Sequence, residues 1–171
     1  VNLERMWRAV NCISPSMIRV EADELTYNLH IVLRYEIERD LIEGRIEVRD
    51  LPERWNGDMV ELLGIEPRNA AEGVLQDIHW ASGLFGYFPT YSIGNLYAAQ
   101  IMESARKGIR GLDRRIEQGD LLPLRDWLKG QIHSHDNVHD ADKTIRRVTG
   151  KPLCTDAFRR HITRKVKAIY G

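Results

Sequence analysis

The sequence predicts an all-α fold, and three observations lead to this prediction. Apolar residues recur at three- and four-residue steps along most of the 171 residues, which is the period of a helix with one buried face. Glycine or proline stands where many of these runs stop, as expected at helix ends. Residues 46–51 alternate apolar with charged side chains, but one strand has nothing to pair with, so we expect an extended connector there.

Composition and charge limit the classes of protein to which the chain can belong. The hydrophobic fraction of 43% and the charged fraction of 29% are typical of one packed domain, which we expect to cover residues 1–171. Lys plus Arg and Asp plus Glu are 25 each, and this balance argues against a nucleic-acid-binding module. No apolar run approaches the roughly 20 residues that span a bilayer, so we expect no membrane partner. Cys12 and Cys154 are typical of reduced thiols in a cytoplasmic protein, with one disulfide as the alternative.

The first two expected helices carry continuous apolar faces. One covers residues 3–10 and ends before Ser14-Pro15-Ser16, where proline removes a backbone donor and serine can cap the next helix. The next runs from about Ile18 to Glu43 and stops at Gly44, a residue type that commonly ends helices. Its apolar stripe consists of Leu25, Leu29, Val32, Leu33, Ile37 and Leu41.

Three helices and one irregular segment are expected in the middle of the chain. A helix over residues 52–63 opens with proline and ends before a glycine. A shorter helix over residues 67–80 begins with Pro-Arg-Asn. Residues 81–90 are the least regular stretch, because two glycines and a proline stand among aromatic residues. From residue 91 a long helix resumes and reaches about residue 107.

The last third of the chain predicts three shorter helices. The first surrounds residues 124–132, and the second runs from about Asp140 to Val148 and stops at Gly150. The third extends to Ile169, with Thr155 or Asp156 capping its start.

The segment from Gln76 to Tyr91 gives the strongest chemical signal. Glycine and proline are costly in a helical protein, so an aromatic segment that contains them favours a bounded cleft or a close backbone approach. His79, Tyr87 and Tyr91 can each donate a hydrogen bond to a developing oxyanion or a peptide carbonyl. The same pattern is also typical of an aromatic helix–helix corner with a core histidine, and the residues alone leave both interpretations open.

Two further patterns have a functional and a structural interpretation. Arg19 and Asp23 stand four residues apart, so on a helix an aspartate-held guanidinium would present a planar fork to a carboxylate, or form an ordinary surface ion pair. His133, His135 and His139 invite a metal-site interpretation, but their spacing falls between two expected helices, and a solvated loop fits better. The chain has no HExxH helix, P-loop or GxSxG elbow.

Two motifs carry a family resemblance that extends over essentially the whole chain. Residues 18–23, IRVEAD, and residues 73–80, GVLQDIHW, resemble the [IV]RxxAD and GxxQDxHW signatures of the carboxypeptidase Taq (M32) zinc metallocarboxypeptidases. The sequences of residues 24–38 and 86–100 also resemble those of that family. The resemblance implies a zincin-type, all-helical cleft, of which this multi-helix array forms one wall. The chain begins at Val1, and we expect it to be the C-terminal third of a parent of about 500 residues.

The resemblance also implies roles for named residues. Arg19 would bind the carboxylate of a peptide substrate, and Asp23 would orient the Arg19 side chain. His79 would hydrogen-bond the substrate or the tetrahedral intermediate. Tyr91 would stabilise the oxyanion, with Tyr87 as the alternative. Three motif residues would support His79, namely Gln76, Asp77 and Trp80.

Cofactor and partners follow from the same resemblance. Zinc would be held by an HExxH helix and a downstream glutamate outside this chain, so we expect no metal within the fragment and no activity from it alone. The expected partners are a peptide, the N-terminal part of the same parent chain, and a second copy in a homodimer. Exposed apolar surface would also make the fragment self-associate. The competing class is a non-catalytic helical binding module. A start codon near Val1 would support this module, whereas an upstream HExxH motif followed by a HES-type motif would support the enzyme.

Overall fold

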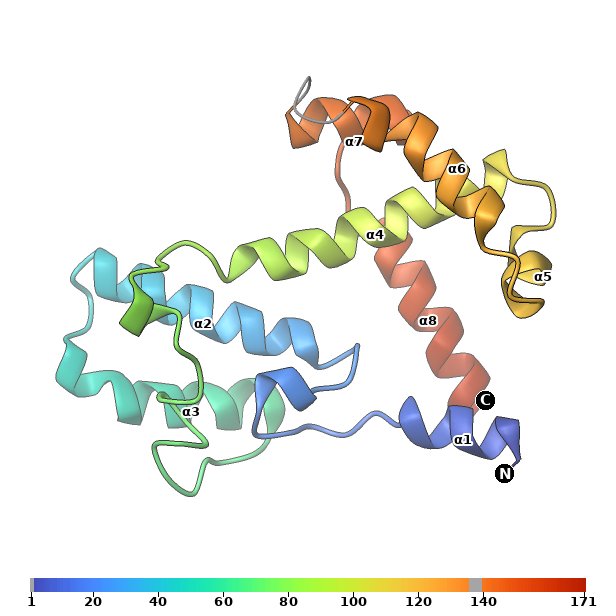
Figure 1. Cartoon of the computed structure of the whole chain (residues 1–171). Coiled ribbons are helices and arrows are strands. Elements are labelled where there is room, and N and C mark those ends of the chain that lie inside the picture. The colour runs from blue at the N-terminus through green and yellow to red at the C-terminus, as the bar shows by residue number, and fades with distance from the viewer. Residues whose placement is uncertain (1, 136–139) are drawn as a thin grey trace. The chain divides into compact units, whose positions relative to one another are not determined.

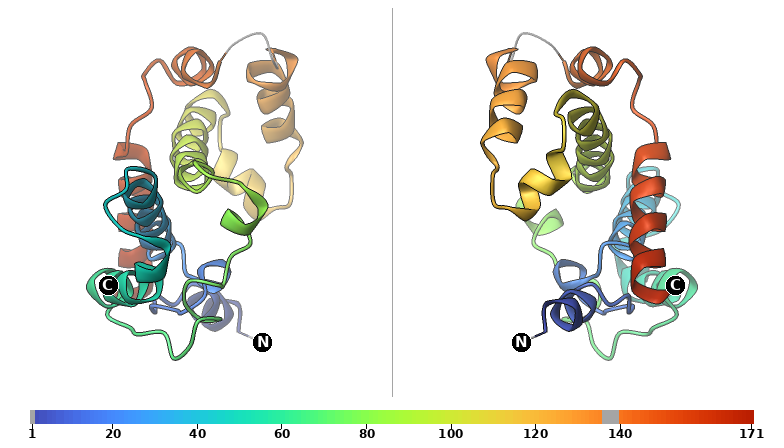
Figure 2. Two further views of the ribbon diagram at one scale, coloured as in Figure 1. Left: turned by 90° about the vertical axis from the view of Figure 1, so that its left-hand side faces the viewer. Right: turned by 90° about the vertical axis from the view of Figure 1, so that its right-hand side faces the viewer.

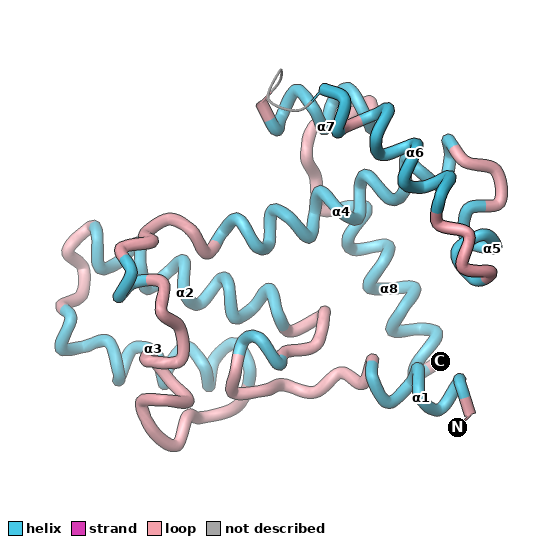
Figure 3. Tube along the Cα trace, viewed as in Figure 1, coloured by secondary structure: helices cyan, strands magenta, loops and turns pink. Residues whose placement is uncertain are grey.

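The computed structural model describes residues 2–135 and 140–171, and its regular elements in these ranges are helices (Figures 1 and 3). The α-helices are α1 Leu3–Val10, α2 Tyr27–Ile42, α3 Leu51–Leu63, α4 Pro89–Gly108, α5 Leu112–Glu117, α6 Leu122–Gln131, α7 Ala141–Thr149 and α8 Asp156–Tyr170. Short 3₁₀ turns cover Arg19–Glu21, Val48–Asp50, Trp80–Ser82 and His133–His135. The all-α prediction is therefore confirmed for the described residues. Among them, no helix is both long enough and apolar enough to cross a membrane.

The described residues form two compact units. The first holds the chain up to Ser92 together with Lys165–Gly171, and the second holds Ile93–Arg164. Every predicted site residue belongs to the first unit.

The core of the first unit lies between α2 and α3, which run side by side (Figures 1 and 2). Its fully packed members are Leu33, Ile37, Trp55, Met59 and Leu63. The start and end of α3 follow the prediction, because proline is accommodated in the first turn and Gly64 adopts φ of 70° after the last. Half-buried Trp80 also packs against this core, which brings the predicted site next to it.

The single long helix expected over residues 18–43 is not formed. Arg19–Glu21 is an isolated 3₁₀ turn, and α2 begins only at Tyr27. The carboxylate of Asp23 accepts hydrogen bonds from the amides of Leu25 and Thr26, at 2.9 and 3.0 Å, and from the Thr26 hydroxyl at 2.8 Å. Aspartate competes for backbone donors in this way and favours a turn over a helix interior. Arg19 and Asp23 therefore do not share a helix face.

The short helix expected over residues 67–80 is also absent, and the chain there follows a series of turns. The Asn69 side chain accepts from the amides of Ala71 and Glu72, both at 3.0 Å, which fixes a turn instead of a continuing helix. The second motif therefore lies on this irregular path and not on a helix of its own.

Of the expected helices, α6 and α7 lie in the second unit and α4 and α8 lie partly in it, while α5 is an addition. α7 begins after Asp140, whose side chain accepts from the Lys143 amide at 2.8 Å, and α8 starts at Asp156. α5 was not predicted, because six residues are too few to show a helical period. Buried Gln100 ties the connection between α7 and α8 by donating to Thr149 Oγ1 and the Pro152 carbonyl, both at 3.0 Å.

Candidate functional site

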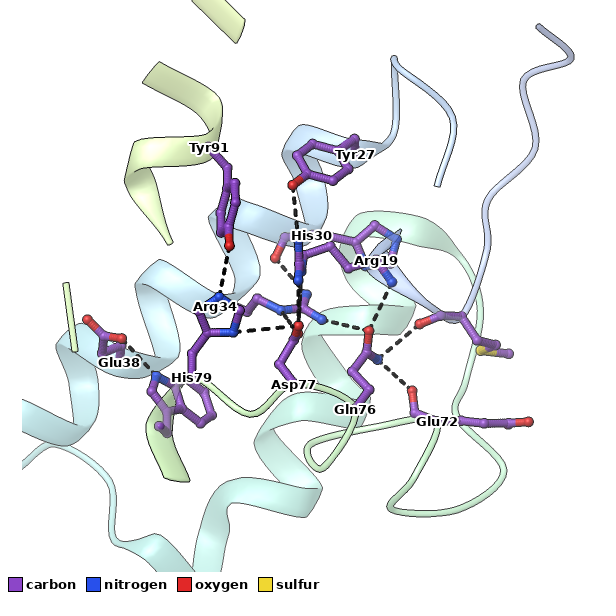
Figure 4. A network of polar contacts seen from close by, with 12 residues as sticks. Arg19, Tyr27, His30, Arg34, Glu38, Glu72, Gln76, Asp77, His79 and Tyr91 are labelled. Atoms are coloured by element: carbon purple, nitrogen blue, oxygen red, sulfur yellow. Dashed lines mark hydrogen bonds and ion pairs between the residues drawn. The ribbon is translucent and has the colours of Figure 1, made fainter. Parts of the chain in front are cut away.

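Three segments of the first unit bring the predicted site residues together (Figure 4). Arg19 comes from the 3₁₀ turn before α2, and Gln76, Asp77 and His79 come from the irregular segment after α3. Tyr91 lies in the first turn of α4. These residues are far apart in the sequence and converge on one face of α2, as a binding site requires.

Asp77 is the centre of the cluster. Its Oδ1 accepts from Arg19 Nη2 at 2.6 Å and Nε at 3.1 Å, and its Oδ2 accepts from Arg34 Nε at 2.6 Å. The Asp77 side chain is only 12% exposed. Burial by itself would raise the pKa of Asp77, but the hydrogen bonds and charges of the two arginines outweigh it and lower that pKa. Two guanidinium groups share one carboxylate here, so this trio carries a net positive charge.

Arg34 is a member of the Asp77 cluster that the sequence did not predict. Its side chain is fully buried, its guanidinium lies 4.6 Å from the Trp55 ring, and it also donates to Gln76 Oε1 at 2.7 Å. Burial lowers the pKa of Arg34 to about 10, against the opposing effect of Asp77. The signal in the sequence is the four-residue spacing of His30, Arg34 and Glu38, three buried polar residues in line on α2.

Two neighbours complete the surroundings of the arginines. The Gln76 amide oxygen accepts from the Arg19 backbone amide at 2.9 Å, and its nitrogen donates to the carbonyls of Met17 and Glu72. Gln76 is thus held from both ends and fixes the backbone of Arg19. Burial, followed by the charge of Arg34, lowers the pKa of His30 to about 4, so this imidazole is neutral near pH 7.

The described partners of Arg19 use only some of its hydrogen-bond donors. A guanidinium offers five N–H bonds. Nε and Nη2 donate to Asp77, and Nη1 donates to the Tyr27 hydroxyl at 3.0 Å, so the described partners engage three of the five. The guanidinium also lies 5.0 Å from the centre of the Tyr91 ring, so Arg19 adjoins the aromatic residues of the site.

His79 and Tyr91 form the second half of the site. His79 Nε2 lies 3.0 Å from the Tyr91 hydroxyl, and the imidazole, 8% exposed, stacks on Phe88 with ring centres 4.4 Å apart. His79 Nδ1 is buried without a hydrogen-bond partner and lies 3.8 Å from Asp77 Oδ1. Tyr87 is 44% exposed and contacts both rings, at 5.7 Å from His79 and 5.4 Å from Tyr91. Both candidate tyrosines therefore adjoin His79, but the hydrogen bond goes to Tyr91.

Asp23 does not lie where the four-residue spacing placed it, whereas Trp80 adjoins the aromatic rings of the site. Asp23 does not contact Arg19; besides its own turn it binds the Ser14 amide at 3.2 Å, and Asp77, 58 residues along the chain, takes the place expected for it. Trp80 donates its indole N–H to Glu38 at 2.7 Å and packs edge-on against Phe88, on which His79 stacks. Tight turns before α2, not helical spacing, decide which carboxylate reaches Arg19.

The described residues contain no group of three or more His, Cys, Asp or Glu side chains that could hold a metal ion. His133 and His135 lie in a 3₁₀ turn, and His139 lies outside the described residues. The cluster around Asp77 is built of cations and amide groups, which are poor metal ligands. The residues described here therefore do not fit a metal site of their own.

Comparison with known proteins gives a consistent result. Residues 1–166 match the family model described as carboxypeptidase Taq (M32) metallopeptidase. Thermostable carboxypeptidase 1 of Thermus thermophilus is 44% identical over 100% of this chain and 34% of its own length. Carboxypeptidase 1 of Bacillus subtilis is 41% identical over 99% of this chain and 34% of its own. The structure of Trypanosoma cruzi metallocarboxypeptidase 1 superposes with a TM-score of 0.90 at 43% identity, over 95% of this chain and 34% of that one. The chain thus spans about a third of the length of these relatives.

Proposed function

The chain belongs to the carboxypeptidase Taq (M32) metallopeptidase family, and from that premise we propose that it forms the substrate-binding wall of a metallocarboxypeptidase. The reaction is the hydrolytic release of C-terminal amino acids from peptides. The observation that carries the proposal is the pairing of a buried, net positive Arg19–Asp77–Arg34 cluster with the His79–Tyr91 hydrogen bond beside it.

The positive cluster suits the free carboxylate of a peptide. Arg19 is held by Asp77 and Tyr27, so its planar fork is fixed before the substrate arrives. Its two remaining N–H bonds can donate to the two oxygens of one carboxylate. A bound carboxylate would also neutralise the excess charge of the two arginines. In this proposal Asp77, not Asp23, orients Arg19.

The His79–Tyr91 pair suits the reacting carbonyl. With a proton on Nε2, His79 donates to the Tyr91 oxygen and leaves the tyrosine O–H free to donate to the substrate. A donor placed in this way stabilises the negative charge that develops on the carbonyl oxygen during hydrolysis. Gln76 and Asp77 support the pair by holding the segment on which His79 lies.

The metal lies outside the described residues in this proposal. The family is one of metallopeptidases, and we propose zinc as its metal, held by ligands from another part of the parent chain. Because the described residues contain no candidate metal group, this chain by itself is expected to release no amino acids.

A pair of peptides tests the proposed function. In a chain of full family length, we expect a peptide with a free C-terminus to be hydrolysed with a kcat/KM at least about 10²-fold higher than its C-terminal amide, the scale of losing a charge-assisted hydrogen bond. Release of the terminal residue is measured by chromatography. Equal rates for the two peptides would contradict carboxylate recognition by Arg19, and release by the 171 residues alone would contradict a metal held elsewhere.

The apolar face of α1 supports the proposed protein partners. Leu3, Met6 and Val10 are 80%, 54% and 71% exposed, although they share one helix face. We propose that the N-terminal part of the same parent chain covers this face and that the parent, a cytoplasmic enzyme, is a homodimer.

Self-association of the 171-residue chain follows from that exposed face. Light scattering on the chain alone should give a molar mass above the monomer value of 19.8 kDa, because uncovered apolar surface drives association. Replacing Leu3 and Val10 with serine is expected to restore the monomer mass. A monomer at all concentrations in the unmodified chain would contradict this prediction.

A further inference from the structure

A buried carboxylate outside the Asp77 cluster fastens the loop that carries the site. Glu38 lies on α2 and is only 6% exposed. One of its oxygens accepts from the indole N–H of Trp80 at 2.7 Å, and the other accepts from the backbone amide of Gly86. Both donors are neutral, and they stand at the two ends of one irregular loop, residues 80–86.

This loop directly joins the groups assigned to the reaction. His79 precedes Trp80, and Tyr87 follows Gly86. Gly83 and Gly86 adopt φ of 71° and 76°, a left-handed conformation that favours glycine, so after the 3₁₀ turn Trp80–Ser82 the loop follows an irregular path. Inside the loop the Leu84 amide donates to the His79 carbonyl at 2.9 Å. The Glu38 carboxylate therefore supplies the anchor by which both ends of the loop meet α2.

A chain of ring contacts connects this anchor to the imidazole. Trp80 packs edge-on against Trp55 and Phe88, with ring centres 6.2 and 6.0 Å apart. Phe88 is 1% exposed and stacks on His79 at 4.4 Å. Because the rings are close-packed, a shift of the Trp80 indole moves Phe88 and the face on which His79 rests.

The two donors explain why a carboxylate occupies this position. Each donor uses a different oxygen of Glu38, and only a carboxylate offers acceptors at both ends. A glutamine of the same size would place an NH₂ group against one of the two N–H donors. Among the residues that the structure describes, no ion pair includes Glu38. Burying a carboxylate without a cation partner is costly, so its presence here needs a reason beyond packing.

We propose that Glu38 is a positioning residue for peptide hydrolysis, holding the 80–86 loop so that His79 and Tyr91 keep their mutual geometry. This inference rests on the proposed function. Glu38 touches neither substrate nor the Arg19 cluster in this role, and it acts through Trp80, Phe88 and the backbone of Gly86.

Kinetics of four variants of a full-length family chain test the proposal: Glu38→Gln, Trp80→Phe, the double variant, and Glu36→Gln as the matched control. Glu36 lies on the same helix, about 200° around its axis from Glu38. Glu38→Gln is expected to lower kcat by roughly 10- to 100-fold, the usual effect of losing a supporting hydrogen-bond partner, with KM within about twofold. Glu36→Gln should leave both parameters unchanged. The double variant should be no slower than Glu38→Gln, because both changes break one contact.

Hydrogen exchange gives a readout that does not depend on activity. The peptide covering residues 80–88 should exchange faster in Glu38→Gln and in Trp80→Phe than in Glu36→Gln, while peptides from α3 stay protected. If Glu38→Gln does not fold, Trp80→Phe keeps both measurements available.

Different outcomes would contradict the positioning role of Glu38 and the proposed function. A kcat in Glu38→Gln or Trp80→Phe equal to that of Glu36→Gln, or fully additive losses in the double variant, would overturn the positioning role. A kcat that falls in Glu38→Gln but not in Tyr91→Phe would overturn the site assignment under the proposed function, while faster exchange in residues 80–88 would still show the anchor.

Discussion

Replacing Asp77 with alanine is expected to lower the free energy of unfolding of this chain by about 3–5 kcal/mol, the effect of removing one partner from a buried ion pair. Asp77 is 12% exposed, and it binds Arg19 and Arg34, whose side chains are 7% and 0% exposed. Without the carboxylate, two buried guanidinium groups face each other with no countercharge. Urea unfolding followed by circular dichroism measures the change.

A surface aspartate serves as the control for this prediction. Asp142 binds Arg146 at 2.7 Å on α7, but its side chain is 59% exposed, so Asp142→Ala should cost no more than about 0.5 kcal/mol. The comparison separates burial from pairing, because both aspartates form ion pairs of similar length. A loss in Asp77→Ala that is as small as the loss in Asp142→Ala would contradict the central place of Asp77.

The same ion pair predicts how stability depends on pH. The pKa of Asp77 is lower in the folded chain than its ordinary value of 3.8, because the hydrogen bonds and charges of Arg19 and Arg34 outweigh the effect of burial. The folded state then binds fewer protons than the unfolded state around that pH. The Asp77 contribution is therefore fully present above about pH 4 and is lost as the pH falls through the lower folded pKa. In Asp77→Ala this acid-induced loss should be smaller than in the unmodified chain.

Local patterns predicted the helices well where capping residues and apolar period agreed. α3 has proline in its first turn and ends before Gly64, and α8 begins at Asp156, one of the two residues expected at its start. The start of α2 could not be predicted, because its apolar stripe continues into residues whose backbone Asp23 draws into a turn. The spacing of apolar residues predicts which face of a helix is buried. It does not predict where a side chain such as aspartate competes for backbone donors and stops the helix.

In the candidate site, too, some features could be predicted from the sequence and others could not. Motif residues such as His79 and Tyr91 could be named from the sequence because their types carry the chemistry, and they do lie together. The partner of Arg19 could not be named, since a four-residue spacing suggests Asp23 while the actual partner is 58 residues away. Arg34 was missed for a related reason. A charged residue in an apolar stripe is usually solvated, and only the folded structure shows it enclosed between Asp77 and Trp55.

Tyr91→Phe in a chain of full family length is expected to lower kcat by about 10²-fold or more, with a smaller change in KM, because one donor to the developing oxyanion is lost. His79→Ala should have a similar effect, since His79 Nε2 lies 3.0 Å from that hydroxyl and fixes its direction. Steady-state hydrolysis of a peptide with a free C-terminus measures both. Tyr87→Phe is the matched control, because Tyr87 is 44% exposed and adjoins His79 through its ring.

The double variant His79→Ala/Tyr91→Phe decides whether the two residues act as one unit. If His79 works only by orienting the Tyr91 hydroxyl, the double variant should be about as slow as the slower single variant. Losses that multiply would mean that each group touches the substrate independently. A large loss in Tyr87→Phe with none in Tyr91→Phe would move the donor role to Tyr87, and unchanged kcat in both His79→Ala and Tyr91→Phe would remove the pair from the reaction. The hydrogen bond between the two side chains makes the non-additive result the expected one, because neither group can keep its direction after the other is removed.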